Sequence, residues 1–377
     1  MQLDFIIKGG HVIDPENNVD YKKDIGVLNG KIVGVDENDT AKNIINAEEY
    51  FVCPGFIDFH THIFHTGSGL GINPDLFFSD GVTTVVDAGT AGCSTYDAFH
   101  NTVIVNSWMN IKSQLNISSQ GQIQLGFAEN YDKKLMDKER IKYLFEKYQG
   151  ELIGLKIRLQ SEVVGELGIK PLFDTIEIAE YIGCPVVIHT TNPPESASEI
   201  VKVLRKGDVY CHCYQGKGHT IINSNGKVFE EIKKARERGV IFDISNGTGN
   251  FGFKVAKEAL EDGFYPDIIS CDSARYLSYS LDYYAKNLPF VMSKFLALGM
   301  SLNDIIKATT STPAKCIGED IRGSLKENNL ADIVIFKLLD KNIEYRDPLG
   351  ENLFGNKIIV PKLTMSNGEV VYCTNDF

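Results

Sequence analysis

Short apolar runs alternate with amphipathic segments through the middle of the chain. The intervening segments have helical spacing and end near a glycine that suits a helix C-cap, as at 136–149, 172–183, 228–239 and 253–263. The apolar runs are 55–62, 81–89, 121–127, 152–159, 185–190, 208–213, 239–244 and 267–273. Strands joined by helices form a parallel sheet, and eight strands close a barrel. The pattern therefore predicts an α/β fold with a (β/α)8 TIM-like barrel.

The two ends of the chain have a different pattern, with short alternating runs separated by turn residues. The N-terminal part contains runs at 4–13 and 24–35, and Asn29-Gly30 is a strong hairpin signal. Asn367-Gly368 is a second such signal near the C-terminus. Chain ends often lie close together. We therefore predict a small composite β-sandwich domain formed by residues 1–53 and 326–377, with the barrel in residues 54–325.

Composition narrows the classes of function. The chain has 377 residues, and its formal net charge is -12, from 38 Lys+Arg against 50 Asp+Glu. This balance repels nucleic acid and anionic membranes, so a small-molecule substrate is expected. The sequence shows neither a signal-peptide pattern nor a long apolar span, and its eight cysteines are too sparse for a disulfide framework. A cytoplasmic protein is expected, and its sequence is compatible with a homo-oligomer.

Metal-capable side chains stand at the ends of five of the apolar runs. His60 and His62 are two apart on the first run, so they share one face of a strand. A single histidine at a strand end is more often a hydrogen-bonded core residue than a ligand, but the recurrence at five strand ends argues against this explanation. The residues are His60, His62, Lys156, His189, His212 and Asp272.

Lys156 and Asp272 carry specific expectations. A lysine in an apolar strand would bury an ammonium at considerable cost unless it is paired or neutral. Beside two metal ions the neutral amine of Lys156 could take up carbon dioxide and become a bridging carbamate. Asp272 could hold one ion and accept a proton from bound water, or it could be a helix N-cap.

Other polar positions are more ambiguous. His65 could reach a substrate or lie at the rim of the barrel. Cys211 and Cys213 flank His212 and are expected to pack in the core, facing away from it. The run GTGNFG at 247–252 resembles a phosphate loop, but a lone glycine-rich turn is weak evidence, and we expect it to open a helix.

Several motifs, taken in order, carry a resemblance to a known family. They are HTH, GLK, VIHT, CHC and CDS in the middle of the chain, with GGHVIDPEN and PGFIDFHTH before them and ADIVIF and SNGEVVY after them. Over nearly its whole length the sequence resembles the amidohydrolase superfamily. GVTTVVDAGTAG, GLKIR and FGFKVAKEAL resemble its deacetylase-like metallohydrolases.

This resemblance implies a binuclear centre with two divalent metal ions, zinc being expected. His60 and His62 with Asp272 would hold one ion, His189 and His212 would hold the other, and N6-carboxylysine at Lys156 would bridge them. The implied reaction removes an acyl group, expected to be acetyl, from a small ester or amide that carries a carboxylic acid. A metal-bridged hydroxide would attack the carbonyl, and Asp272 would carry the proton to the leaving group.

Substrate contacts are suggested at two places. Arg158 shares a strand face with Lys156, and its guanidinium could pair with a substrate carboxylate or form a salt bridge at the rim. The turn 87–92 could present the N–H groups of Ala91 and Gly92 to the substrate, or its glycines could simply permit the turn.

Departures from the family pattern lie around the substrate rather than the metals, at Tyr214, Gln215, Asn246 and the Ser-Ala pair after Asp272. The alternative function is a cyclic amidase of the dihydroorotase or hydantoinase type, because such enzymes share the ligand set. Lys156 argues against a deaminase, since deaminases of this superfamily commonly use one metal and lack the bridging lysine. The six filled ligand positions argue against a barrel without enzyme activity.

Overall fold

A curled parallel sheet forms the centre of the molecule in the computed structural model, which describes residues 1–124, 126–275 and 285–377. Its seven strands run in sequence order, β8 to β14, and every neighbouring pair is parallel. The strands are β8 (Phe56–Thr61), β9 (Val82–Gly92), β10 (Asn110–Asn116), β11 (Leu152–Arg158), β12 (Val186–His189), β13 (Val209–Cys211) and β14 (Ile241–Asp243). The predicted α/β barrel is confirmed, with its last position filled irregularly.

The segment expected as the eighth strand closes the ring without forming a regular strand. Ile268 bridges to Asp243 of β14, and Ser273 bridges to Thr61 of β8. The N–H of His62 donates to the carbonyl of Ser273 at 2.8 Å, which fixes this segment against the first strand. Asp272 interrupts the extended backbone because its φ is 57°, in the left-handed region. The barrel therefore closes through a few backbone contacts at the level of the predicted ligands.

The prediction for the third strand is wrong. The third strand is β10, and the residues predicted for it, 121–127, follow β10 as a loop. Leu125 lies outside the described residues. Only Ile111 and Leu115 of β10 are buried apolar side chains, whereas Gln114 and Asn116 are polar and equally buried. Because its buried positions are largely polar, β10 does not appear as an apolar run.

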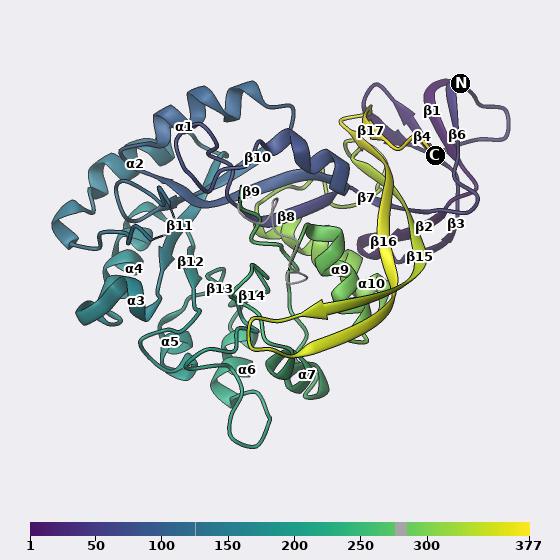
Figure 1. The fold of residues 1–377 in the computed structure, drawn as a ribbon. Coiled ribbons are helices and arrows are strands. Elements are labelled where there is room, and N and C mark those ends of the chain that lie inside the picture. The colour runs from purple at the N-terminus through teal and green to yellow at the C-terminus, as the bar shows by residue number, and fades with distance from the viewer. Residues whose placement is uncertain (125, 276–284) are drawn as a thin grey trace.

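Helices surround the sheet on its outer side (Figure 1). A helix is present at each of the four segments that were predicted to be helical. These helices are α2 (Lys138–Lys147), α4 (Lys170–Ile182), α6 (Glu230–Glu237) and α7 (Phe253–Glu261). The others described are α1 (Tyr96–Thr102), α3 (Ser161–Val164), α5 (Ala197–Val203), α9 (Leu288–Ala297), α10 (Leu302–Thr309) and α11 (Ser311–Cys316).

Local signals explain where the helices begin and end. Asp137 accepts a hydrogen bond from the N–H of Arg140 and caps the start of α2, and Gly183 ends α4 with a φ of 83°. Across the described part of the chain, no helix is both long and apolar enough to cross a membrane.

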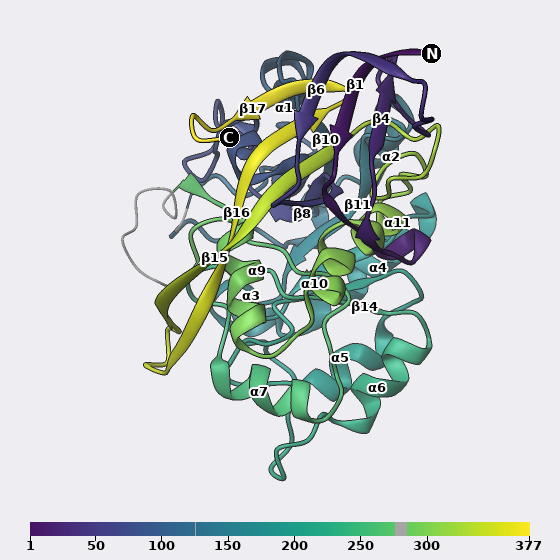
Figure 2. The same cartoon turned by 90° about the vertical axis from the view of Figure 1, so that its right-hand side faces the viewer.

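Both ends of the chain contribute to the β-rich region beside the barrel (Figure 2). One sheet has the order β5-β4-β1-β6, and the other has the order β17-β16-β15-β7-β2-β3, so the second combines strands from both ends. Asn29 and Gly30, like Asn367 and Gly368, have the positive φ of tight hairpin turns. The strands are β1 (Gln2–Lys8), β2 (His11–Asp14), β3 (Val19–Lys22), β4 (Ile25–Leu28), β5 (Lys31–Val33), β6 (Thr40–Asn46), β7 (Phe51–Pro54), β15 (Ile333–Arg346), β16 (Asn352–Ser366) and β17 (Glu369–Cys373).

The composite β region is thus confirmed, and its division from the barrel at 53/54 and 325/326 stays a prediction. Residues from both ends share one apolar core, including Val27, Val52 and Ile335. This shared core explains why two segments so far apart in sequence form one unit.

A long hairpin made by β15 and β16 extends from the β region along the barrel toward α7 (Figures 1 and 2). At its tip the buried Asp347 accepts a hydrogen bond of 2.8 Å from the N–H of Phe253, the first residue of α7. A side chain at Gly216 would meet Leu349 at 2.4 Å, and one at Gly252 would meet it at 3.2 Å. The hairpin tip therefore packs against the loops that follow β13 and β14.

Candidate metal centre

The predicted ligands gather at the carboxyl ends of the barrel strands. A cavity of about 400 Å³ opens there, and five of the six line it: His60, His62, Lys156, His189 and Asp272. The sixth, His212, is fully buried directly beside them. A larger cavity of about 710 Å³ lies between α9 and the β15–β16 hairpin, but its lining contains no histidine.

His60 and His62 converge on Asp272 from the end of β8. The Nε2 atoms of His60 and His62 lie 3.5 Å and 3.4 Å from Asp272 Oδ1. A contact of 2.8 Å between His62 Nδ1 and the hydroxyl of Thr90 fixes the orientation of the His62 ring. One carboxylate oxygen and two imidazole nitrogens therefore face a common point, which is the donor set that a divalent ion prefers.

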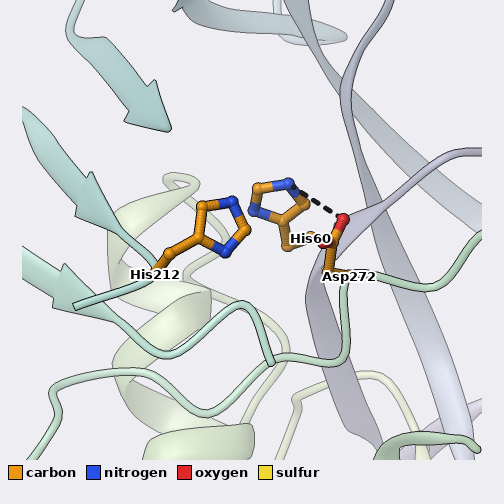
Figure 3. A group of neighbouring side chains, drawn as sticks. All are labelled: His60, His212 and Asp272. Atoms are coloured by element: carbon orange, nitrogen blue, oxygen red, sulfur yellow. Dashed lines mark ion pairs between the residues drawn. The ribbon is translucent and has the colours of Figure 1, made fainter. Parts of the chain in front are cut away.

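His212 and His189 form the other side of the cluster. Their ring centroids are 4.1 Å apart, and His212 also lies 5.2 Å from His60. His212 Nδ1 donates to the carbonyl of Ser245 at 2.7 Å, so its Nε2 carries a free lone pair. Ligand atoms of His60, His212 and Asp272 lie within 4.8 Å of one another, and Figure 3 shows the three side chains pointing together.

The backbone is strained where these ligands leave the sheet. His212, Ser245 and Asp272 have φ values of 60°, 42° and 57°, which non-glycine residues rarely adopt. Such conformations persist only where the surrounding structure holds them, and they are concentrated at functional sites. At His212 and Asp272 the positive φ interrupts the extended backbone where the predicted ligands leave the sheet.

Lys156 lies between the two groups of histidines. Its side chain is 3% exposed, and its Nζ lies 3.3 Å from His60 Nε2 and 4.0 Å from Cys211 Sγ. None of the carboxylates in the described residues forms an ion pair with it, although a buried ammonium requires a counter-charge. A modification of Lys156 that adds negative charge would supply this counter-charge.

The electrostatics of the cluster suit cation binding. Burial lowers the pKa of His60 and of His189 well below its usual value and that of His212 to about 3, so these rings are neutral near pH 7. Burial acts to raise the pKa of Asp272, but His60 and the other histidines outweigh it and hold this pKa below its ordinary range. Neutral imidazoles and an ionised carboxylate are the forms that bind metals.

Polar atoms without partners provide a test of whether metal ions fit. His189 Nε2 and His212 Nε2 are buried and have no hydrogen-bond partner in the described structure. Buried imidazole nitrogens are rarely left unsatisfied, since the loss costs about 1–3 kcal/mol each. The centroids of the two rings lie 4.1 Å apart, and His212 offers a ligand atom together with His60 and Asp272, so the residues present fit divalent metal ions.

Sequence reasoning missed an acidic layer beneath the ligands. Asp243 Oδ2 lies 3.8 Å from His60 Nδ1 and accepts a hydrogen bond from Ser245, while Asp58 accepts one from the N–H of Cys271. Burial raises the pKa of Asp58 to about 8 and also raises that of Asp243. Asp243 ends the apolar run at 239–244, so its place at a strand end was the available signal.

Cys211 and Cys213 are buried, as expected, but Cys211 does not face away from the site. Its Sγ lies near Lys156 and 3.8 Å from Asp243 Oδ2. The prediction failed because β13 ends at Cys211, and the alternation of side chains does not continue to His212 in its left-handed conformation.

The expected substrate contacts have different surroundings. Arg158 lines the cavity, but its Nη1 lies 3.6 Å from Oε2 of Glu129, whose side chain is fully buried. Ala91 and Gly92 are buried at the end of β9, where the N–H of Gly92 donates to Thr95 Oγ1, and the described cavity wall does not include them. Their roles in binding substrate stay predictions.

The departures from the family pattern fall into two groups. The Tyr214 hydroxyl donates to the carbonyl of Phe264 and belongs to the core, and Lys294 donates to Asn246 Oδ1 at 2.9 Å. Gln215 is buried and accepts a hydrogen bond of 2.7 Å from the N–H of Lys217, so it shapes a loop at the cavity. His65 is exposed and does not line the cavity, and whether it contacts substrate stays open.

Gly89 offers a test of how closely Lys156 is packed. A Cβ at Gly89 would lie 2.6 Å from Lys156 Cβ, and the φ of Gly89 is 76°. Gly89→Ala should therefore lower the free energy of unfolding by roughly 2–5 kcal/mol, combining backbone strain and overpacking. Chemical denaturation measures this loss. Gly150→Ala is the matched control, because Gly150 has a φ of 80° but open space around it; equal losses in both variants would contradict the close packing.

Comparisons with known proteins identify the family of the chain. The sequence model of the amidohydrolase family matches residues 51–371. A deacetylase of Agrobacterium fabrum is 31% identical over 329 residues, which are 87% of this chain and 80% of that protein. The crystal structure of an adenine deaminase matches with a TM-score of 0.89 at 27% identity, covering 99% of this chain and 100% of that chain. The crystal structure of a dihydroorotase matches with a TM-score of 0.88 at 29% identity, covering 98% of this chain and 99% of that chain. The chain belongs to the amidohydrolase family and is a metal-dependent hydrolase.

Proposed function

We propose that the protein removes an acyl group, acetyl above all, from a small ester or amide that carries a carboxylate. The observation that carries this proposal is the convergence of four histidines, Lys156 and Asp272 on one small cavity. The similarity to a deacetylase over most of both chains supports the choice of an acyl group. The acidic net charge and the cavity of about 400 Å³ support a small substrate rather than a macromolecule.

Six side chains would hold two divalent ions, with zinc the expected metal. His60, His62 and Asp272 would bind one ion, His189 and His212 the other, and carboxylated Lys156 would bridge them. Such ions acidify a bound water to a pKa of about 7 and polarise a carbonyl oxygen. The absence of a paired carboxylate at Lys156 within the described residues supports the carbamate, which would supply the missing negative charge.

Asp272 would carry the proton during the reaction. Its Oδ1 faces His60 and His62, and its Oδ2 accepts a hydrogen bond of 2.9 Å from Asn250 Nδ2. Asn250 Oδ1 in turn accepts from the hydroxyl of Thr191 at 2.8 Å. These two hydrogen bonds fix the plane of the Asp272 carboxylate. Asp272 can then take a proton from the attacking water and deliver it to the leaving group. No protein nucleophile is needed.

The alternative is hydrolysis of a cyclic amide. Its specific support is the dihydroorotase structure, which matches nearly the whole chain at 29% identity. The two functions use the same ligand set and differ in the shape of the substrate. Lys156 keeps heterocycle deamination a weaker candidate, although an adenine deaminase structure matches as well.

Metal analysis combined with a substrate panel tests this proposal. We expect about two divalent ions per chain by elemental analysis and hydrolysis of acetyl-α-hydroxy acids or N-acetyl amino acids. The panel includes both enantiomers, dihydroorotate and hydantoins. Turnover of cyclic amides alone would contradict the deacetylase function. A metal-free protein, even after expression with zinc and bicarbonate, would contradict the whole mechanism.

A further inference from the structure

The glycine-rich loop between β14 and α7 lines the cavity, and its contacts with Asp272 involve only part of it, at Gly247 and the Asn250 side chain. Thr248, Gly249 and Asn250 all lie in the cavity wall. Within the described residues, no acceptor is found for the backbone N–H group of any of the three. Successive unpaired N–H groups in a turn form a concavity that binds anions. The sequence run GTGNFG therefore does more than open a helix.

Lys217 brings a positive charge to the same place. It lines the cavity, and its Nζ lies 3.8 Å from the position that a Cβ on Gly249 would occupy. The backbone of Lys217 is fixed, because its N–H donates to the buried Gln215 Oε1. Its ammonium forms no ion pair within the described part of the chain, and the carboxylate of Glu162 is close enough to attract it. The ammonium of Lys217 can therefore attract an anionic ligand in the cavity beside Gly249.

Besides Lys217, and Lys156 at the metal cluster, the described cavity lining contains one more Lys or Arg side chain, Arg158, whose charge is already compensated. Arg158 has the buried carboxylate of Glu129 at 3.6 Å, and the Arg158 side chain is 17% exposed. An arginine with a buried counter-ion has less net attraction for a second carboxylate than a lysine that has no carboxylate within ion-pair distance and only the attraction of Glu162. The charge distribution of the cavity therefore favours Lys217 as the residue that recognises an anionic substrate.

We propose that Lys217 and the N–H groups of Thr248, Gly249 and Asn250 form the subsite that binds the carboxylate of the substrate. This inference rests on the proposed acyl hydrolysis and assigns its specificity-determining residue. Arg158 with Glu129 then supports the cavity wall rather than binding the acid.

Two contacts tie this subsite to the metal cluster and to the β region. Asn250 Nδ2 donates to Asp272 Oδ2, so the loop that would bind the carboxylate also positions the proton carrier. On its other side, the N–H of Gly252 donates to the carbonyl of Tyr214, and Leu349 of the hairpin tip packs on Gly252 and Gly216. The loops bearing Lys217 and Asn250 are therefore held together by the C-terminal hairpin.

The test compares 2-acetoxypropanoate with its uncharged counterpart, 2-acetoxypropanamide. Lys217→Gln should raise KM for the acid about tenfold, the loss expected for one charged hydrogen bond, and leave kcat and the kinetics of the amide unchanged. Calorimetric affinity for 2-hydroxypropanoate, the product acid, should fall by a similar factor. Lys254→Gln is the control, because Lys254 is exposed in α7 and does not line the cavity.

A second variant distinguishes Lys217 from Arg158. Arg158→Gln combined with Glu129→Gln removes both members of the buried pair without leaving one charge alone, and it should keep the preference for the acid over the amide. Loss of that preference in the double variant, or its persistence in Lys217→Gln, would overturn the proposal. If the unaltered enzyme hydrolyses neither compound, the fault lies with the proposed function, and calorimetry with the product acid still tests Lys217.

Discussion

Asp272→Asn should keep the protein folded and lower kcat/KM by roughly 10²- to 10⁴-fold, the contribution of a positioned general acid and base. Asparagine has nearly the shape of aspartate and tolerates the left-handed φ of 57° found at this position. It removes the negative charge that faces His60 and His62 and the oxygen that would receive the proton. Steady-state kinetics on the preferred acetylated acid measure the effect.

The control for this variant is Asp320→Asn, which changes an exposed aspartate that does not line the cavity. Circular dichroism and the unfolding midpoint should be similar in both variants. If Asp272→Asn retained more than about a tenth of the original kcat/KM with its metal content intact, Asp272 would not be the proton carrier.

Lys156→Ala should lose metal ions and activity together. A carbamate on Lys156 would be the one ligand shared by both ions, so its loss should weaken metal binding by more than the roughly 10- to 100-fold seen for outer-shell partners. Elemental analysis should show a fall from about two ions per chain to about one or fewer. Acetate or formate in the assay should restore part of the activity, because either carboxylate could occupy the position of the carbamate.

Alanine also leaves a cavity beside His60, so Lys156→Met is the matched variant. Methionine fills most of the space of lysine but cannot be carboxylated. Both variants should behave alike if the carbamate matters, whereas a defect confined to Lys156→Ala would indicate a packing role. Unchanged metal content in both variants would show that the lysine does not bridge.

The spacing of apolar runs was sufficient to predict the barrel and most of its strands. Runs such as 152–159 and 185–190 are apolar because parallel strands are buried on both faces. β10 was missed because its buried residues include Gln114 and Asn116. The last strand was expected as regular, but isolated bridges at Ile268 and Ser273, together with hydrogen bonds to the Asp58 side chain, close the ring. A local sequence pattern cannot reveal the polar strand β10 or the irregular last strand, since both depend on the residues that neighbouring strands contribute around them.

The ligand cluster could be predicted for a geometric reason. In a barrel the carboxyl ends of all strands meet at one edge, so polar side chains at strand ends must be neighbours whatever the intervening loops do. His60, His189 and His212 are far apart in sequence, and the structure brings their rings together. The roles of these residues as metal ligands stay a prediction, and the distances between their side chains are compatible with it.

The sequence by itself determined the fold class, the composite β region and the set of residues that gather at the strand ends, because periodicity and strand direction are properties of the local chain. Only the tertiary structure decided how charge is distributed in the cavity. It pairs Arg158 with the buried Glu129, leaves Lys217 facing the loop at Gly249, and places the hairpin tip at Leu349 against both loops. These contacts join residues from unrelated parts of the chain, and electrostatic pairing depends on distance and burial, which no sequence spacing fixes.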